Sequence, residues 1–254
     1  MKEQWRLLQT GLNTAFSNMA IDQAVLVANS DGMVPPTVRF YGWMPPAISI
    51  GYFQSLTDEI DIQACERFGV NYVRRITGGG AVFHEKELTY SIVIPESHIK
   101  IPKNIMESYS RICGAIMKGL QYLGIESDYA PINDIVAGGR KISGNAQTRK
   151  LQTVLQHGTV LMDVDVDKMF SLLKIPNEKI KDKLIDDVKQ RVTSVKHFLG
   201  KEMRFTQIAE AMKVGFEEEF QVELIEGMLS TGELTLAKKL EKERFSTIQW
   251  NHRR

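Results

Sequence analysis

The segment RRITGGGAVFH, residues 74–84, places the strongest constraint on how this chain folds. It separates two apolar segments, VNYV and LTYSIVI, and both have the composition of β-strands. Three consecutive glycines lose much conformational entropy on folding and bring no side chain to a core. The segment therefore predicts either a mobile turn or a loop whose backbone another group approaches closely. For a glycine triplet taken alone, the mobile turn is favoured.

The surroundings of the triplet do not match the known nucleotide-binding loops. The loop follows a strand, as phosphate loops do, but it fits neither G-x-x-x-x-G-K-S/T nor G-x-G-x-x-G, and it leads into another strand. Anion binding stays open, because exposed backbone N–H groups and the planar guanidinium of Arg74 or Arg75 can bind phosphate or carboxylate.

Composition narrows the class of protein. A length of 254 residues, 43% of them hydrophobic, suits one large domain or one domain with a small appendage. The net charge of +1 gives no overall field for nucleic acid or a membrane surface. Cys65 and Cys113 are too few for a disulfide framework, and neither a signal peptide nor a membrane-spanning segment is apparent. We expect a cytoplasmic globular protein without nucleic-acid or membrane partners.

Hydrophobic periodicity predicts an α/β fold of the α+β type, with a mixed, largely antiparallel sheet flanked by helices. The first helix should follow a cap at Asn13 or Thr14, and the longest should occupy 104–123 and end at Gly124. We expect a single domain over 1–254, with 165–254 a mostly helical C-terminal part. Strands are expected at 37–41, 47–53, 70–76, 88–94 and 151–164, a helix at 62–68, and a hairpin with its turn at 137–140.

Several further residues could carry chemistry, although each also has an ordinary structural interpretation. Lys141 in RKISGNAQ could hold a positive charge over an oxyanion or phosphate, but a hairpin lysine is usually just solvated. His157 lies in an apolar run, as buried histidines do. Asn133 and Asp134 could be a turn pair, or an anchor for a nucleotide or magnesium ion. The two cysteines fit buried structural thiols.

The order of these segments carries more information than any one of them. RRITGGGAVFHEKELTYS, then NDI and GRKISGNAQ, then LQHGTVLMDVD resemble the lipoate–protein ligase and octanoyltransferase family, whose catalytic fold is shared with biotin–protein ligases. The likeness extends over nearly the whole chain, including TVRFYGW, ISIGYFQ and FSTIQWN.

The resemblance implies the biotin/lipoate ligase catalytic fold and an ATP-dependent lipoate–protein ligase. Such an enzyme uses ATP and Mg²⁺ to convert lipoate, or octanoate, to an acyl-adenylate. It then acylates a lysine of a lipoyl carrier, either a glycine cleavage H protein-like protein or a 2-oxoacid dehydrogenase E2 lipoyl domain. On this basis the glycine loop leaves room where the ligand passes and admits no side chain.

The resemblance also assigns residues. Lys141 is the expected catalytic residue, and Asp134 is a candidate Mg²⁺ ligand. The expected substrate- and adenylate-binding residues are Arg74, Thr77, Gly78, Gly79, Gly80, Ala81, Val82, His84, Asn133, Asp134, Gly144, His157 and Gly158.

Three other functions compete with the ligase. An octanoyltransferase of this fold carries the acyl group on a loop cysteine, and the corresponding segment here, DYAPINDI, contains none, so this activity is disfavoured. A biotin ligase would carry a G-R-G-R-x-G-R block in place of RRITGGG. A non-enzymatic lipoyl-adenylate-binding protein is a further alternative. Because FSTIQWNHRR leaves no room for the family's accessory domain, we expect a separate small accessory subunit.

Overall fold

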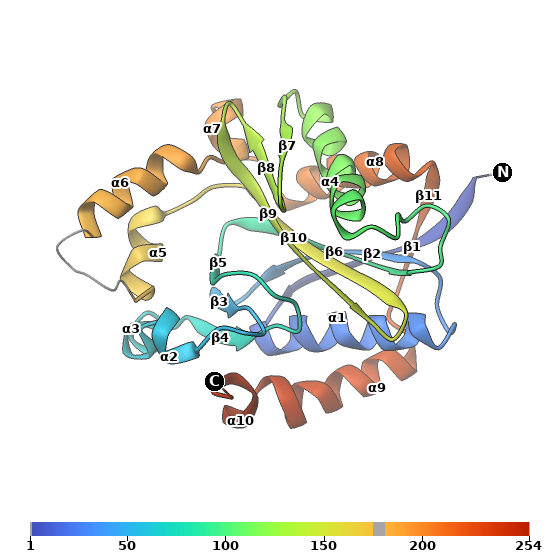
Figure 1. The fold of residues 1–254 in the computed structure, drawn as a ribbon, viewed down its shortest axis with the longest axis horizontal. Helices are drawn as coiled ribbons and strands as arrows, with labels where there is room; N and C mark the ends of the chain where they lie inside the picture. Colours follow the sequence, from blue (N-terminus) through green and yellow to red (C-terminus); the bar gives the residue numbers. More distant parts are fainter. Residues whose placement is uncertain (1, 175–180, 254) are drawn as a thin grey trace.

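An eight-stranded mixed sheet runs through the centre of the computed structural model, which describes residues 2–174 and 181–253 (Figure 1). From edge to edge the strands are β11 (Val222–Gly227), β1 (Glu3–Asn13), β2 (Thr37–Trp43), β6 (Glu87–Pro95), β10 (Thr153–Leu161), β9 (Arg140–Lys150), β8 (Asp134–Ala137) and β7 (Asp128–Ala130).

The pairing confirms the predicted mixed, largely antiparallel sheet. Strand β1 runs parallel to both β11 and β2, and every pair from β2 to β7 is antiparallel. Three strands of this sheet were not predicted from the sequence: β1, the short edge strand β7, and β11, which lies in the part expected to be helical. β11 buries only Val222 and Leu224, and its partner is more than two hundred residues earlier in the chain, so local periodicity gives little sign of it.

A smaller sheet holds the glycine loop. Its order is β4 (Asn71–Arg74), β3 (Ala47–Ile50) and β5 (Val82–His84), and it packs against α2 (Leu56–Glu59) and α3 (Ile62–Arg67). The loop, residues 75–81, connects the two outer strands and passes the end of β3. A Cβ atom on Gly51 would lie 2.0 Å from the carbonyl oxygen of Gly79, so a glycine at the end of β3 permits this crossing.

Helices cover both faces of the large sheet (Figure 1). On one face lie α4 (Ile105–Tyr122) and α8 (Phe205–Phe220), and on the other lie α1 (Ala15–Ser30) and α9 (Thr231–Leu240). Thr14 caps α1, as predicted, by accepting a hydrogen bond from the Ser17 N–H. The remaining helices are α5 (Val166–Leu172), α6 (Lys181–Arg191), α7 (Val195–Leu199), α10 (Ile248–Asn251) and a π-helical turn at Glu241–Phe245.

No helix in the described part of the chain is long and apolar enough to cross a membrane.

The contact between α4 and α8 depends on close backbone approach. A Cβ atom on Gly215 of α8 would lie 2.1 Å from the carbonyl oxygen of Ala115 and 2.5 Å from the amide nitrogen of Gly119. Both of these atoms belong to the backbone of α4, so neither can rotate away. The small residues therefore set the distance between the two helices that cover this face of the sheet.

We expect Gly215→Ala to destabilise the fold by about 1–3 kcal/mol through overpacking, although alanine favours a helix by about 1 kcal/mol over glycine. Urea unfolding followed by circular dichroism measures the effect. The matched control is Gly114→Ala in α4, whose Cβ would meet only the Glu219 carboxylate, at 3.1 Å or more. Equal midpoints for the two variants would show that the α4–α8 contact is not limiting.

Candidate active site

A cavity of about 150 Å³ lies between the two sheets. Strand β3, the glycine loop and β5 form one side, and β2, β6, β9 and β10 of the large sheet form the other. Its apolar lining consists of Met19, Tyr41, Trp43, Ala81, Val82 and Ala146. Its polar side chains are Ser49, Arg75, His84, Thr89, Asn133, Lys141, Asn145, His157 and Thr159.

Most of the residues predicted for the site line this cavity. They are Gly79, Gly80, Ala81, Val82, His84, Asn133, Lys141, Gly144, His157 and Gly158. Thr77, Gly78 and Asp134 do not line it but contact residues that do. Arg74 is the exception, because it points elsewhere.

The guanidinium of Arg74 is fully buried and bound to backbone carbonyls. It donates to the carbonyl oxygens of Gly51 at 3.1 Å, Gln54 at 2.5 Å and Asn251 at 2.8 Å. Arg74 therefore joins the end of β3 to the C-terminal helix α10 and does not reach the cavity. The prediction that Arg74 meets a ligand is corrected: the arginine that lines the cavity is Arg75.

The glycine loop closes around Arg75. The Nη2 atom of Arg75 donates to the carbonyl oxygens of Gly78 at 2.8 Å and Gly80 at 2.7 Å. Burial lowers the pKa of Arg75 to about 10, which leaves the guanidinium charged at neutral pH. Gly79 has φ +96°, and a Cβ there would lie 2.8 Å from Arg75 Nη2.

The three glycines of the loop differ in the space that surrounds them. Gly79 needs its left-handed backbone and has no space for a side chain. A Cβ on Gly78 or Gly80, in contrast, would meet nothing within 4 Å, so the protein itself leaves space at these two positions, and the expectation that a ligand occupies this space stays a prediction. What shapes the loop is the buried cation of Arg75, which the loop carbonyls surround.

Lys141 is held at the cavity by the hairpin of β8 and β9. Its Nζ atom lies 2.7 Å from Oδ1 of Asp134, and the Lys141 side chain is 42% exposed. Gly138 and Gly139 form the predicted turn, both with positive φ. A Cβ on Gly144 would lie 2.8 Å from Lys141 Nζ, so this glycine leaves room for the ammonium group.

The donors near Asp134 do not form a metal site on their own. Its carboxylate is paired with Lys141, and no group of three His, Cys, Asp or Glu side chains that could hold a metal ion occurs in residues 2–174 and 181–253. The predicted role of Asp134 as a Mg²⁺ ligand therefore stays a prediction. In this structure Asp134 is the counter-ion of Lys141.

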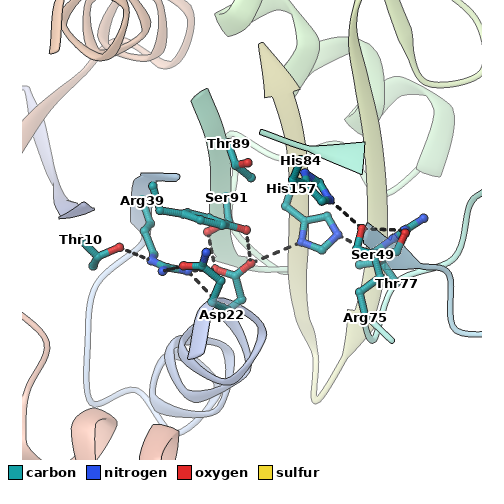
Figure 2. A network of polar contacts seen from close by, with 12 residues as sticks. Thr10, Asp22, Arg39, Ser49, Arg75, Thr77, His84, Thr89, Ser91 and His157 are labelled. Carbon is teal, nitrogen blue, oxygen red and sulfur yellow. Dashed lines mark hydrogen bonds and ion pairs between the residues drawn. The ribbon is translucent and has the colours of Figure 1, made fainter. Parts of the chain in front are cut away.

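A buried polar network continues from the cavity into the large sheet (Figure 2). The Asp22 carboxylate lies 2.7 Å from Arg39 Nη1 and accepts hydrogen bonds from Tyr41 at 2.9 Å and Ser91 at 2.9 Å. His157 completes the set, with Nδ1 3.3 Å from Asp22 Oδ2. These contacts join α1 to β2, β6 and β10.

This network fixes the charge states at the floor of the cavity. Burial raises the pKa of Asp22, but the Arg39 charge and the hydrogen bonds outweigh it, and the pKa lies below its ordinary value. Burial lowers the pKa of His157 despite the nearby carboxylate. His157 is accordingly a neutral imidazole at neutral pH, and it contacts the Thr77 hydroxyl through Nε2 at 2.8 Å.

A second imidazole, that of His84, lies between a hydroxyl and a carboxylate. His84 Nε2 is 2.8 Å from Ser49 Oγ, and Nδ1 is 2.6 Å from Glu87 Oε1. The indole ring of Trp43 stacks on the imidazole, with ring centroids 4.0 Å apart and planes 16° apart. His84 is therefore held in one orientation by three groups.

The site also contains Ser49, Trp43, Asn145 and the Asp22 network, none of which was predicted from the sequence. Two weak signals were available. Asp22 is a carboxylate within the apolar stripe of α1, and Ser49 is the polar residue in the apolar strand AISI. Buried polar residues of this kind need partners, but the identity of the partner depends on tertiary register.

The site thus combines a lysine held by a carboxylate with a cavity that has an apolar lining, between two sheets of an α/β fold. Residues 14–217 match the family described as the lipoyl protein ligase A/B catalytic domain, and the chain belongs to this family. The resemblance deduced from the sequence is thereby confirmed.

Relatives that align with the whole chain have a more specific name. Octanoyltransferase LipM of Geobacillus kaustophilus is 38% identical over 276 aligned positions, covering 100% of this chain and 99% of the relative. Octanoyltransferase LipM of Bacillus subtilis is 33% identical, with the same coverage.

Solved structures confirm the predicted fold. A bi-partite lipoate protein ligase from Thermoplasma acidophilum, described together with its E2 lipoyl domain, superposes with a TM-score of 0.89 at 27% identity, covering 98% of this chain and 96% of that one. A lipoate-protein ligase A bound with ATP gives a TM-score of 0.84 at 27% identity, with 99% of both chains covered.

The relatives overturn one prediction. An ATP-dependent lipoate ligase was expected and an octanoyltransferase disfavoured, whereas the more similar full-length relatives are octanoyltransferases. The prediction made the absence of a loop cysteine decisive. The absence of that cysteine excludes a thioester at that position, but it does not exclude acyl transfer through another group. The chain is an enzyme of the lipoyl and octanoyl transferase family.

We expect Asp22→Asn to destabilise the protein by about 3–5 kcal/mol, because it leaves the buried Arg39 guanidinium without its counter-charge. Urea unfolding at pH 7 measures this loss. Asp31→Asn, at an exposed position after α1, is the matched control and should change little. If both variants unfold at the wild-type midpoint, the ion pair does not support the fold.

We expect the free energy of unfolding to decrease as the pH falls below about 6.5, the ordinary pKa of histidine. The unfolded chain takes up a proton at residue 157 there, while burial disfavours the same proton in the folded protein. Stability that depends on ionised Asp22 is lost only at still lower pH. His157→Gln should flatten the profile measured by urea unfolding from pH 8 to 5, whereas His252→Gln, at an exposed position, should not. Parallel profiles for all three proteins would exclude His157 as the source.

Proposed function

We propose that this enzyme is an octanoyltransferase, which moves an octanoyl group from a carrier-protein thioester to the amino group of a lysine on a lipoyl carrier domain. The full-length relatives named octanoyltransferase support this activity. The observation that carries it in the structure is the Lys141–Asp134 ion pair at the mouth of a cavity with an apolar lining.

The cavity suits an acyl chain that ends in a reactive carbonyl. Met19, Trp43 and Val82 provide apolar surface for the hydrocarbon, whose removal from water favours binding. Arg75 and Lys141 provide positive charge on the same cavity walls. The acyl chain would occupy the apolar part, and the carbonyl would lie toward the two cations.

Lys141 has the chemistry needed at the reacting carbon. Attack on a thioester or ester carbonyl places negative charge on the carbonyl oxygen, and a fixed ammonium group stabilises that charge in the transition state. Two residues fix the position of the ammonium group. Asp134 pairs with Lys141 Nζ, and Gly144 leaves space for it. The acceptor lysine of the carrier domain must arrive as a free amine to attack.

The proposed reaction needs no nucleotide. A thioester is already activated, so its conversion to an amide consumes neither ATP nor Mg²⁺, and no acyl-adenylate forms. The separate accessory subunit expected for a ligase is then not required either. The acceptor would be an H protein-like protein or an E2 lipoyl domain, in line with the E2 lipoyl domain described with the Thermoplasma ligase.

The decisive test compares two acyl donors. One reaction contains the purified chain, an apo lipoyl domain and octanoyl-acyl carrier protein without ATP. The other replaces that donor with octanoate, ATP and Mg²⁺. Mass spectrometry of the lipoyl domain should show octanoylation in the first reaction. Octanoylation confined to the second would refute the proposed reaction.

We expect Lys141→Met to lower kcat for this transfer by about 10²–10³-fold, because one preorganised oxyanion-stabilising charge is removed. Steady-state kinetics with the octanoyl donor measure the change, and circular dichroism checks the fold. Lys103→Met is the matched control, since Lys103 is exposed and does not line the cavity. A kcat within twofold of wild type would remove Lys141 from the chemistry.

A further inference from the structure

The loop cysteine expected of an octanoyltransferase of this fold is missing from DYAPINDI, and the two cysteines present do not replace it. Cys65 on α3 and Cys113 on α4 are buried, and neither lines the cavity. Burial raises the pKa of Cys65 to about 11 and that of Cys113 to about 12, so both are thiols at neutral pH. If the enzyme forms an acyl intermediate, another side chain must carry the acyl group.

The cavity wall contains a hydroxyl with the partners that a nucleophile needs. Ser49 lies on β3, and the pairing of β3 with β5 places Ala47 opposite His84, which brings the imidazole to Ser49. Ser49 Oγ and His84 Nε2 are 2.8 Å apart, and both residues line the cavity. Glu87 begins β6 and lies 2.6 Å from the other imidazole nitrogen, Nδ1. Hydroxyl, imidazole and carboxylate thus form one continuous chain of contacts (Figure 2 shows Ser49 and His84).

The hydrogen bonds around this chain define the direction of proton transfer. Thr89 donates to Glu87 Oε1 at 2.5 Å and accepts from the Trp43 indole N–H at 2.7 Å, so the carboxylate is left to accept from His84 Nδ1–H. Nε2 then carries the lone pair that faces Ser49. With its proton on Nδ1, His84 can accept the Ser49 proton, the role of the imidazole in serine acyl-transfer enzymes.

A cation adjoins the same hydroxyl. Arg75 Nη1 donates to Ser49 Oγ at 3.0 Å and to the Ser49 carbonyl oxygen at 2.9 Å. Within the described residues, Arg75 also donates to the Thr77 hydroxyl and to the carbonyl oxygens of Gly78 and Gly80, and all of these acceptors are neutral. The positive charge therefore favours negative charge that develops on Ser49 Oγ or on a carbonyl oxygen beside it.

A second hydroxyl, imidazole and carboxylate are linked in the same way and provide a comparison. Thr77 Oγ1, His157 and Asp22 are also linked, at 2.8 and 3.3 Å. Thr77, however, is fully buried and does not line the cavity, and the Asp22 carboxylate is shared by Arg39, Tyr41 and Ser91. The Thr77–His157–Asp22 contacts therefore support the fold. The Ser49–His84–Glu87 contacts, in contrast, reach the space where an acyl group would lie.

We propose that Ser49 is the nucleophile of this acyltransferase, with His84 as its general base and Glu87 as the residue that positions His84. This proposal rests on the proposed octanoyl transfer. Ser49 Oγ attacks the thioester carbonyl carbon as its proton passes to His84 Nε2. The C–S bond breaks, and the leaving sulfur takes that proton, which leaves an octanoyl ester on Ser49.

The second half-reaction releases the enzyme. The lysine amine of the lipoyl domain attacks the ester carbonyl, the C–O bond to Ser49 breaks, and the serine oxygen recovers a proton by way of His84. The products are an amide on the lipoyl domain and free enzyme. The two half-reactions together require neither a redox partner nor a nucleotide.

The test is to trap the ester. Wild-type enzyme is mixed with octanoyl-acyl carrier protein in the absence of a lipoyl domain, quenched in acid, and analysed by intact and peptide mass spectrometry. We expect one octanoyl group on the peptide that contains Ser49. The Cys65→Ser/Cys113→Ser double variant should carry the same adduct, which separates an ester on Ser49 from a thioester on either thiol.

Two substitutions at one position keep the test informative. Ser49→Ala should abolish the adduct and lower octanoyl transfer by at least about 10³-fold. Ser49→Cys should restore an adduct that neutral hydroxylamine cleaves, as expected of a thioester. The matched control is Ser108→Ala, a fully buried serine on α4 that does not line the cavity and should leave both readouts unchanged.

The outcomes separate this proposal from the proposed function. If wild type and Ser49→Ala octanoylate the lipoyl domain at equal rates, transfer occurs and Ser49 is not the nucleophile. An adduct that maps to another residue also overturns the Ser49 assignment. If wild type forms the Ser49 ester but does not modify a lipoyl domain, the nucleophile is supported and the acceptor is wrong. If wild type forms no adduct and transfers nothing, both proposals are overturned.

Discussion

The carboxylate of Asp22 is the contact on which the rest of the structure depends. From helix α1 it meets Arg39 of β2, Ser91 of β6 and His157 of β10, so one side chain joins the helix to three strands of the large sheet. Ion pairs at such depth contribute little net free energy, but removal of one partner is costly. The pairing therefore specifies where α1 lies against the sheet, and through His157 it also specifies the floor of the cavity.

Arg75 performs a comparable task on the other side of the cavity. Its guanidinium donates to Ser49, to Thr77 and to the carbonyls of the glycine loop, and thereby links the two hydroxyl–imidazole chains. The loop is thus organised by a cation from within. A loop held in this way keeps its backbone in place without packing side chains.

Local patterns predicted the elements that form by local rules. The apolar stripe of α1, the long helix α4, the alternation in β6 and the Gly138–Gly139 hairpin all follow from spacing and turn chemistry. β1 and β11 were missed because a parallel pair is specified by distant partners. Arg74 and Arg75 could not be assigned from sequence, since adjacent side chains at a strand end point to opposite sides and only the tertiary fold shows which side holds the cavity. Ser49, His84 and Glu87 come from three strands, so only strand register reveals their contact.

The anchoring of Arg74 by the C-terminal helix has a consequence for how the protein is made. The Arg74 N–H donates to Asn251 Oδ1, 177 residues further along the chain, and the Trp250 indole donates to the Arg74 carbonyl oxygen. A ribosome therefore releases the strands of the catalytic cavity long before it releases the residues that fix the adjoining loop. During synthesis, therefore, Arg74 lacks the partners that α10 provides until the last residues of that helix have emerged.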